Sequence, residues 1–159
     1  MFDRKALVSA VFFVSALTLS QVSSEFSPSA NAQGDPIAER QAAMKDNNRQ
    51  VKVLAAIAKG DTKFDGATVK EASATILAGL TKAQGSFPEG SINPKTSYAL
   101  PVIWQKPDDF TKRFGDAKAA AGALVEIGTA NQADQFRPAL KRLGDACGSC
   151  HEVFRKPEN

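Results

Sequence analysis

Cys147-Gly148-Ser149-Cys150-His151, near the end of the 159-residue chain, is the stretch on which the interpretation of the whole sequence depends. It contains both cysteines and the single histidine of the chain. The pattern C-x-x-C-H marks covalent haem attachment, in which two thiols add to the porphyrin vinyl groups and the adjacent imidazole binds the iron. On a helix, positions i, i+3 and i+4 share one face. The stretch therefore predicts one covalently bound haem c.

Other interpretations of the two cysteines fit the sequence less well. A thioredoxin-type redox pair needs a βαβ context, but no strand-like alternation of useful length occurs here. A zinc site needs a fourth ligand, and the chain has no second histidine or third cysteine. Two cysteines that only fill a helical core would leave His151 unexplained. A thiol–disulfide protein without haem remains a further alternative.

The composition is that of an ordinary globular protein, with 43% hydrophobic and 23% charged residues. The formal net charge is +3 and is not gathered into a basic block, which argues against nucleic-acid binding. The length allows one domain. No acid–base pair or nucleophile stands out, so the sequence does not predict an enzyme.

Residues 1–32 have the features of a secretory signal peptide. A basic start is followed by an apolar segment, Ala6 to Leu19, which is shorter than a typical membrane span. Ala30-Asn31-Ala32 is an A-x-A cleavage site, so the predicted mature domain is residues 33–159. An uncleaved anchor is the alternative. After cleavage no stable membrane anchor is expected.

Apolar spacing in the mature chain predicts four amphipathic helices. Residues 86–107 contain four prolines and predict a long loop that packs on the core or has a function. Pro138 falls inside the last helix and predicts that its first turn or two is separate or kinked. The predicted helices run from the Asp35-Pro36 cap to Lys59, from Gly66 to Gln84, from about Asp108 to Gly128, and from the Gly128–Asn131 turn to about Lys156. This order predicts an all-α antiparallel four-helix bundle.

The first and last helices each place chemistry on an inner face. In the first helix, Gln41 and Asn48 lie on the apolar stripe with Met44, so something polar is expected to face this helix. In the last helix, the cysteines are in phase with the apolar stripe, which consists of Phe136, Leu140, Leu143, Cys147, Cys150 and Phe154. A haem between these two helices would meet both faces.

Iron in a porphyrin has two axial positions, and His151 is expected to take one. Met44 is the single methionine of the predicted mature chain. A methionine on an apolar stripe usually fills the core, but with a haem on the facing helix its thioether becomes the candidate for the second position. Thioether ligation raises the reduction potential. Without it, the iron would be five-coordinate and open to small gases.

The chain resembles the class II cytochromes c, the cytochrome c′ family, a four-helix-bundle family with C-x-x-C-H on the last helix. The residues that carry the resemblance are Arg40-Gln41-x-x-Met44, Trp104, and C-x-x-C-H-x-x-F-R from Cys147 to Arg155. The resemblance covers the whole predicted mature chain.

The resemblance implies a periplasmic monohaem cytochrome that carries single electrons, with His151 and Met44 as axial ligands. Low-spin members of the family use a methionine at this position as the sixth ligand. Met44-Lys45-Asp46-Asn47 and Ile57-Ala58-Lys59-Gly60 resemble that branch, whereas Arg40-Gln41 also occurs in high-spin members. The alternative is a five-coordinate cytochrome c′ that binds nitric oxide or carbon monoxide.

Further cofactor contacts and partners are expected on the same basis. The position of Arg40 suggests that it pairs with a haem propionate, and Gln41 is a second cofactor-binding candidate. Arg155 lies one turn after His151, where it would screen the imidazole or approach a propionate. Phe114 and Phe154 are expected to pack against the haem. The partners implied are redox proteins of a respiratory or photosynthetic chain, and a homodimer through the first two helices is possible.

Overall fold

The computed structural model describes residues 34–157, so the predicted signal peptide lies outside the described residues. Five helices occur within this range. Four are long, and the fifth is a single turn between the second and third long helices. In chain order they are α1 (Pro36–Lys59), α2 (Gly66–Gln84), α3 (Val102–Gln105), α4 (Pro107–Thr129) and α5 (Ala133–Phe154).

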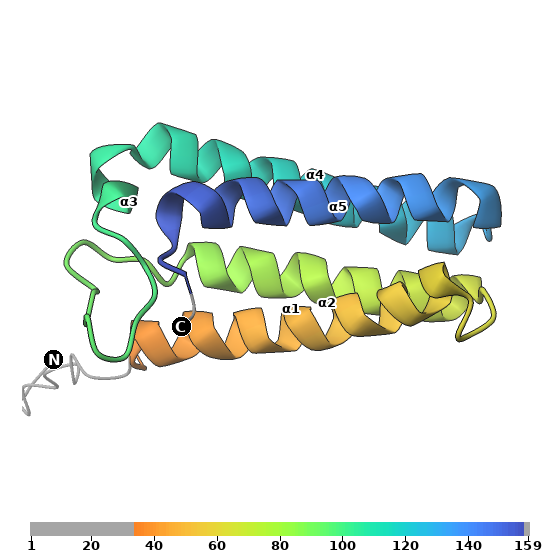
Figure 1. The fold of residues 1–159 in the computed structure, drawn as a ribbon, viewed down its shortest axis with the longest axis horizontal. Helices are drawn as coiled ribbons and strands as arrows, with labels where there is room; N and C mark the ends of the chain where they lie inside the picture. The colour runs from red at the N-terminus through yellow and green to blue at the C-terminus, as the bar shows by residue number, and fades with distance from the viewer. Residues whose placement is uncertain (1–33, 158–159) are drawn as a thin grey trace, which may run out of the picture. The chain divides into compact units, whose positions relative to one another are not determined.

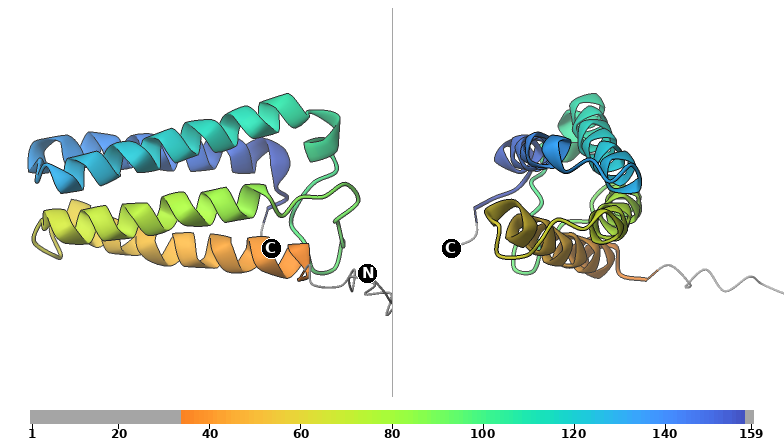
Figure 2. Two further views of the ribbon diagram at one scale, coloured as in Figure 1. Left: turned by 180° about the vertical axis from the view of Figure 1, so that it is seen from behind. Right: turned by 90° about the vertical axis from the view of Figure 1, so that its right-hand side faces the viewer.

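The four long helices form an antiparallel bundle, which confirms the predicted fold class (Figures 1 and 2). Each packs extensively against its neighbour in sequence, α1 on α2, α2 on α4 and α4 on α5. The first and last helices make few contacts with each other. None of the helices in the described range is long and apolar enough to cross a membrane.

The ends of α1 and α2 follow from local chemistry and lie where the sequence predicts them. The Asp35 carboxylate accepts a hydrogen bond of 2.9 Å from the Ile37 N–H at the start of α1, next to Pro36. Gly60 ends α1 with a φ of 88°, in the left-handed region that glycine adopts without strain. Asp65 caps α2 in the same way, accepting 2.8 Å from the Thr68 N–H.

The last helix differs from the prediction at Pro138. No separate first turn forms, because α5 is one helix from Ala133 to Phe154. Pro138 lies close to the helix start, so it removes only one early backbone hydrogen bond. The flanking Phe136 and Ala139 are buried in the core and hold this turn in place.

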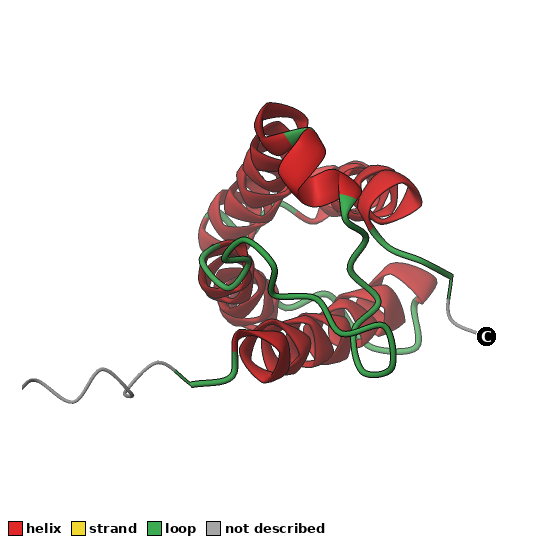
Figure 3. Ribbon diagram, turned by 90° about the vertical axis from the view of Figure 1, so that its left-hand side faces the viewer, coloured by secondary structure: helices red, strands yellow, loops and turns green. Residues whose placement is uncertain are grey.

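Residues 85–101, called the crossover loop below, cross one end of the bundle between α2 and α3 (Figure 3). The Trp104 indole donates to the Phe87 carbonyl at 3.2 Å. The Leu100 N–H donates to the Phe154 carbonyl at 3.0 Å, and Ala99 forms an isolated bridge with Arg155. The predicted packing of this segment on the core is confirmed, since Phe87 and Ala99 of the loop pack against the hydrophobic core cluster. The predicted loop of residues 86–107 differs in one respect, because it includes the short helix α3, whose Ile103 is part of the core.

The opposite end of the bundle is closed by close helix contact. Gly66 and Gly128 face each other there, and a Cβ on Gly66 would lie 2.5 Å from the Gly128 carbonyl oxygen. Glycine is needed at both positions because any side chain would collide with backbone. Leu54, Val69 and Leu124 are fully buried in the same half.

Candidate functional site

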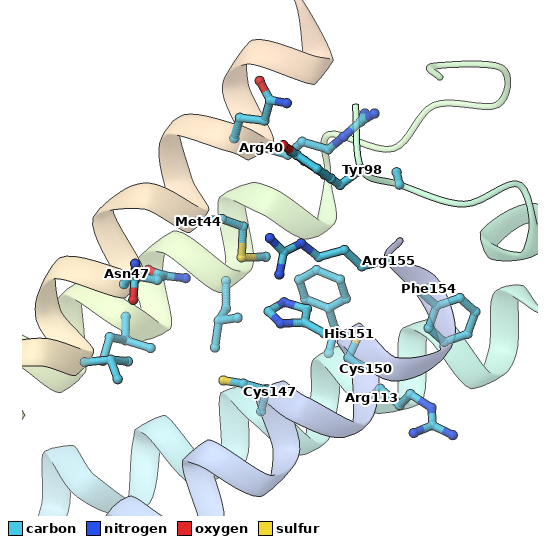
Figure 4. Close-up of a pocket in the computed structure, with 18 of the residues that line it drawn as sticks. Arg40, Met44, Asn47, Tyr98, Arg113, Cys147, Cys150, His151, Phe154 and Arg155 are labelled. Atoms are coloured by element: carbon cyan, nitrogen blue, oxygen red, sulfur yellow. The ribbon is translucent and has the colours of Figure 1, made fainter. Parts of the chain in front are cut away.

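A cavity of about 830 Å³ lies between the long helices and reaches the crossover loop. Its volume falls within the range of small-molecule and cofactor sites. Figure 4 shows the predicted axial residues on opposite sides of this space, Met44 on α1 and His151 on α5. Much of the remaining wall is apolar and consists of Val51, Ile76, Leu80, Phe87, Ile103, Phe110, Phe114, Ala117, Leu140, Leu143 and Phe154.

The C-x-x-C-H stretch lies within α5, and its helical spacing turns all three chemical groups toward the cavity. Cys147 and Cys150 are half-buried free thiols. Burial raises the pKa of Cys147, and it raises the pKa of Cys150 to about 11 against the opposing charge of Arg113. Desolvation in the cavity wall, together with the nearby charge of Arg155, lowers the pKa of His151, although its side chain remains partly accessible to solvent.

Met44 is half-buried on α1, and its thioether sulfur projects into the cavity toward the His151 ring (Figure 4). The two side chains are far apart in sequence and reach the same space from facing helices. The fold therefore brings together the two predicted iron ligands. Their bonding to iron remains a prediction.

The polar residues that α1 turns to the cavity include those that the sequence predicts, and the structure also buries two others. Gln41 and Asn48 line the cavity as expected but are exposed, whereas the fully buried polar residues are Arg40 and Asn47. The reason is that α1 has two inward faces, one packed on α2 and one turned to the cavity. Gln41 satisfies part of its amide by donating from Nε2 to the Thr96 carbonyl in the crossover loop.

Arg40 is only 4% exposed and anchors the crossover loop. Its Nη1 donates to the Ser86 carbonyl at 2.8 Å and to the Ser91 hydroxyl at 3.1 Å. Its Nη2 donates to the Ser91 carbonyl and to the Ser97 hydroxyl. The guanidinium also lies 4.6 Å from the centre of the Phe87 ring. Arg40 lines the cavity, so the predicted propionate contact stays open, but the loop already uses four of its donors.

Arg155 lies near His151 and lines the cavity, as its sequence position suggests (Figure 4). Its guanidinium is 5.4 Å from the centre of the Tyr98 ring. Its charge helps to lower the pKa of His151, which is the screening effect considered from the sequence. A propionate contact of Arg155 remains a prediction.

Arg113 on α4 is a site residue that the sequence reasoning missed. Its Nε donates to the Asp109 carboxylate at 3.0 Å, and its Nη1 donates to the Ser149 carbonyl inside the haem motif at 2.8 Å. Arg113 also lines the cavity. The available signal was the Asp109–Arg113 pair at i, i+4, which is common on exposed helix faces and therefore uninformative by itself.

The residues of the cavity fit a haem. Two thiols and an imidazole share one wall, a thioether faces them, and Phe114 and Phe154 are buried in the apolar surround, each 5.0–5.1 Å from the Phe110 ring centre. Among the described residues, no group of three or more His, Cys, Asp or Glu side chains is placed to hold a metal ion directly. Paired thiols next to an imidazole are the groups that covalent haem attachment uses.

Comparison with known proteins gives consistent matches. The sequence model of the family described as Cytochrome C′ matches residues 35–155. A cytochrome c′ of Pararhodospirillum photometricum is 35% identical over 117 residues, covering 74% of this chain and 93% of that protein. A cytochrome c-556 of Rhodopseudomonas palustris is 36% identical over 132 residues, covering 80% and 87%. The crystal structure of cytochrome c′ from Rubrivivax gelatinosus superimposes with a TM-score of 0.72 at 26% identity, covering 77% and 96%.

Proposed function

The chain belongs to the cytochrome c′ family and binds covalently attached haem c, and we propose that it carries single electrons with His151 and Met44 as axial ligands. In this proposal Cys147 and Cys150 form the thioether bonds to the haem. Bound haem iron supplies the one-electron change between the ferric and ferrous states. The observation that carries the proposal is that the Met44 sulfur and the His151 imidazole project into one cavity from facing helices (Figure 4).

The protein's contribution is to hold both ligands on rigid elements. Met44 and His151 each lie inside a helix of more than 20 residues, so neither ligand depends on a loop for its position. Two fixed protein ligands limit rearrangement between redox states. Much of the cavity wall is apolar, and a thioether ligand favours the reduced state and a raised potential.

The second candidate is a five-coordinate haem protein that binds nitric oxide or carbon monoxide. One observation favours it. Asn47 places an unpartnered amide on the cavity wall one turn from Met44, which is where a small polar ligand would lie if Met44 did not bind iron. Under the first candidate function the haem accepts and donates single electrons, and under the second its iron binds a small gas. Neither function is enzymatic.

The proposed location is the periplasm, and the proposed partners are redox proteins of a respiratory or photosynthetic chain. A homodimer through α1 and α2 is proposed from family membership. Val53 on α1 supports it, because its side chain is a large apolar group that is 41% exposed.

Replacement of Met44 tests the ligand assignment. We expect wild-type ferrous protein to give sharp α and β bands that carbon monoxide does not alter, and Met44→Ala to give a high-spin spectrum that carbon monoxide shifts. The matched control is Val51→Ala, which also shortens a cavity-lining side chain of α1 and should leave the spectrum low-spin.

Two results would decide against the proposal. A broad high-spin wild-type spectrum that shifts with carbon monoxide would establish the gas-binding alternative. Protein made with haem-maturation machinery but showing no Soret band would leave the thiol–disulfide interpretation.

A further inference from the structure

Asn47 on α1 is a buried amide with no hydrogen-bond partner. It is 7% exposed, and both its Oδ1 and its Nδ2 lack a partner in the structure. Among the described residues, the only other buried side-chain polar atom without a hydrogen-bond partner is the Ser73 hydroxyl oxygen. Buried polar groups nearly always form hydrogen bonds, so a buried amide with two unpaired atoms indicates a partner other than a protein side chain.

The packing around Asn47 restricts where that partner can lie. On one side the amide packs against Gly79 of α2, where an added Cβ would collide with Oδ1. Gly79 has no side chain, so it offers the amide no side-chain hydrogen-bond partner. On its other side Asn47 lines the haem cavity, on the same wall as Met44 (Figure 4). The missing partner must come from the cavity.

The haem itself is a poor candidate for this partner. Its ring and both its faces are apolar or occupied by axial ligands, and its only strong acceptors are the propionates. Those are expected near Arg40 and Gln41, which lie roughly 10 Å back along α1 from Asn47 at a rise of 1.5 Å per residue. The partner is therefore a small polar molecule.

We propose that the Asn47 carboxamide binds one water molecule in the wall of the haem cavity beside Met44. A primary amide can donate from Nδ2 to a water oxygen while Oδ1 accepts from the same water, which satisfies both unpaired atoms at once. Buried waters occur at such sites when polar partners are present. The proposed water adds a component to the haem site of the proposed function. It rests on that function, because the haem is assumed to fill the remainder of the cavity.

This water has a functional consequence for the haem. It lies on the Met44 side of the ring, where it makes the surroundings of the iron more polar and so favours the more highly charged ferric state. It is also the molecule best placed to reach the iron whenever Met44 is displaced. Asn47 is thus a positioning residue that acts on the reduction potential through the water it holds.

The test uses the haem-loaded protein and two variants, Asn47→Leu and the control Asn48→Leu. Asn48 is the adjacent amide and also lines the cavity, but it is exposed. A crystal structure of the wild type should show an ordered water within hydrogen-bond distance of both Asn47 side-chain atoms. Asn47→Leu should lack this water and have a higher reduction potential, whereas Asn48→Leu should match the wild type.

A dry Asn47 amide, or an amide bonded to a propionate or to protein, would overturn the proposal. An unchanged potential in Asn47→Leu would do the same. If that variant does not fold, the wild-type crystal structure decides by itself. The optical spectrum separates this outcome from the proposed function: a high-spin wild type would remove Met44 as ligand, yet the presence or absence of the Asn47 water would still be read directly.

Discussion

The two ends of the bundle use the same apolar periodicity for different purposes. At the end formed by the turns after α1 and α4, Leu54, Val69 and Leu124 are completely buried against other side chains. At the end covered by the crossover loop, Met44, Cys147 and Cys150 occupy equivalent stripe positions but are only half-buried, because they line the cavity. Periodicity identifies the inward face of a helix, whereas residue chemistry shows whether that face meets protein or cofactor.

The closed end also tolerates far less change. Gly66 and Gly128 bring α2 and α4 into backbone contact, where a Cβ on Gly128 would lie 2.5 Å from the Lys70 nitrogen. The cavity end instead relies on polar anchors such as Arg40. Substitutions at the closed end should therefore change stability alone. Substitutions at the cavity end should change the attachment, absorption spectrum or reduction potential of the haem.

The largest effect is expected from replacing both motif thiols, because this removes the haem attachment site that distinguishes the cavity end from the closed end. Cys147→Ser with Cys150→Ser leaves no sulfur to form a thioether, since these are the only cysteines of the chain. We expect complete loss of covalent haem, measured by haem staining after denaturing electrophoresis and by mass. Ser149→Ala is the control and should keep its haem. Covalent haem in the double variant would contradict the attachment site.

A leucine truncation at each end tests whether the two ends respond differently. Leu124→Ala should lower the free energy of unfolding by about 2–5 kcal/mol, because it opens a cavity in a fully packed region. Its haem spectrum should be unchanged. Leu140→Ala, at a half-buried cavity position, should cost less stability and perturb the haem spectrum. Denaturant unfolding and absorption spectra measure both, and equal spectral shifts would show that the ends are not distinct.

A smaller effect is expected from Arg113→Met, which tests whether charge at the cavity end affects the reduction potential of the haem. The variant removes a positive charge beside the haem motif and leaves Asp109 unpaired, so the reduction potential should fall. The lost contacts to Asp109 and Ser149 should lower stability by about 1 kcal/mol. Lys112→Met is the matched control, since Lys112 pairs with Asp116 on the exposed face of the same helix. Equal potentials for the two variants would exclude a role for Arg113.

The smallest effect is expected at the Asp65 cap of the closed end. Hydrogen bonds from the Thr68 hydroxyl and N–H lower the pKa of Asp65 from its ordinary 3.8. A lowered pKa means that the ionised carboxylate stabilises the folded state above the ordinary value, and that this contribution is lost as the pH falls through the folded pKa. Asp65→Asn should therefore be less stable than wild type near neutral pH and approach it at acid pH. Thermal melting at several pH values measures this difference, and an equal difference in stability between Asp65→Asn and wild type at every pH would contradict the prediction.

The helix ends and the haem motif were predictable because their signals are local. Asp35, Pro36 and Gly60 fix the ends of α1 through caps and backbone angles that need no tertiary information. The spacing from Cys147 to His151 likewise sets three groups on one helix face. These features follow from neighbouring residues alone.

The remainder depends on contacts between distant residues. Arg40 anchors the crossover loop because Ser86, Ser91 and Ser97 reach it in three dimensions, and no sequence spacing predicts those partners. Arg113 contacts Ser149 across two helices for the same reason. The first turn of α5 is not separate, as one form of the prediction at Pro138 had it, because burial of Phe136 and Ala139 outweighs the loss of one hydrogen bond.

The sparse contact between α1 and α5 has a consequence for how the molecule assembles. Most helix packing joins neighbours in sequence, which is a topology of low contact order that favours rapid folding. The first and last helices are joined mainly through the cavity that Met44 and His151 face. Bound haem would contact both α1 and α5 and so link the first and last helices of the chain. Haem binding and the final packing of α1 against α5 would then be coupled.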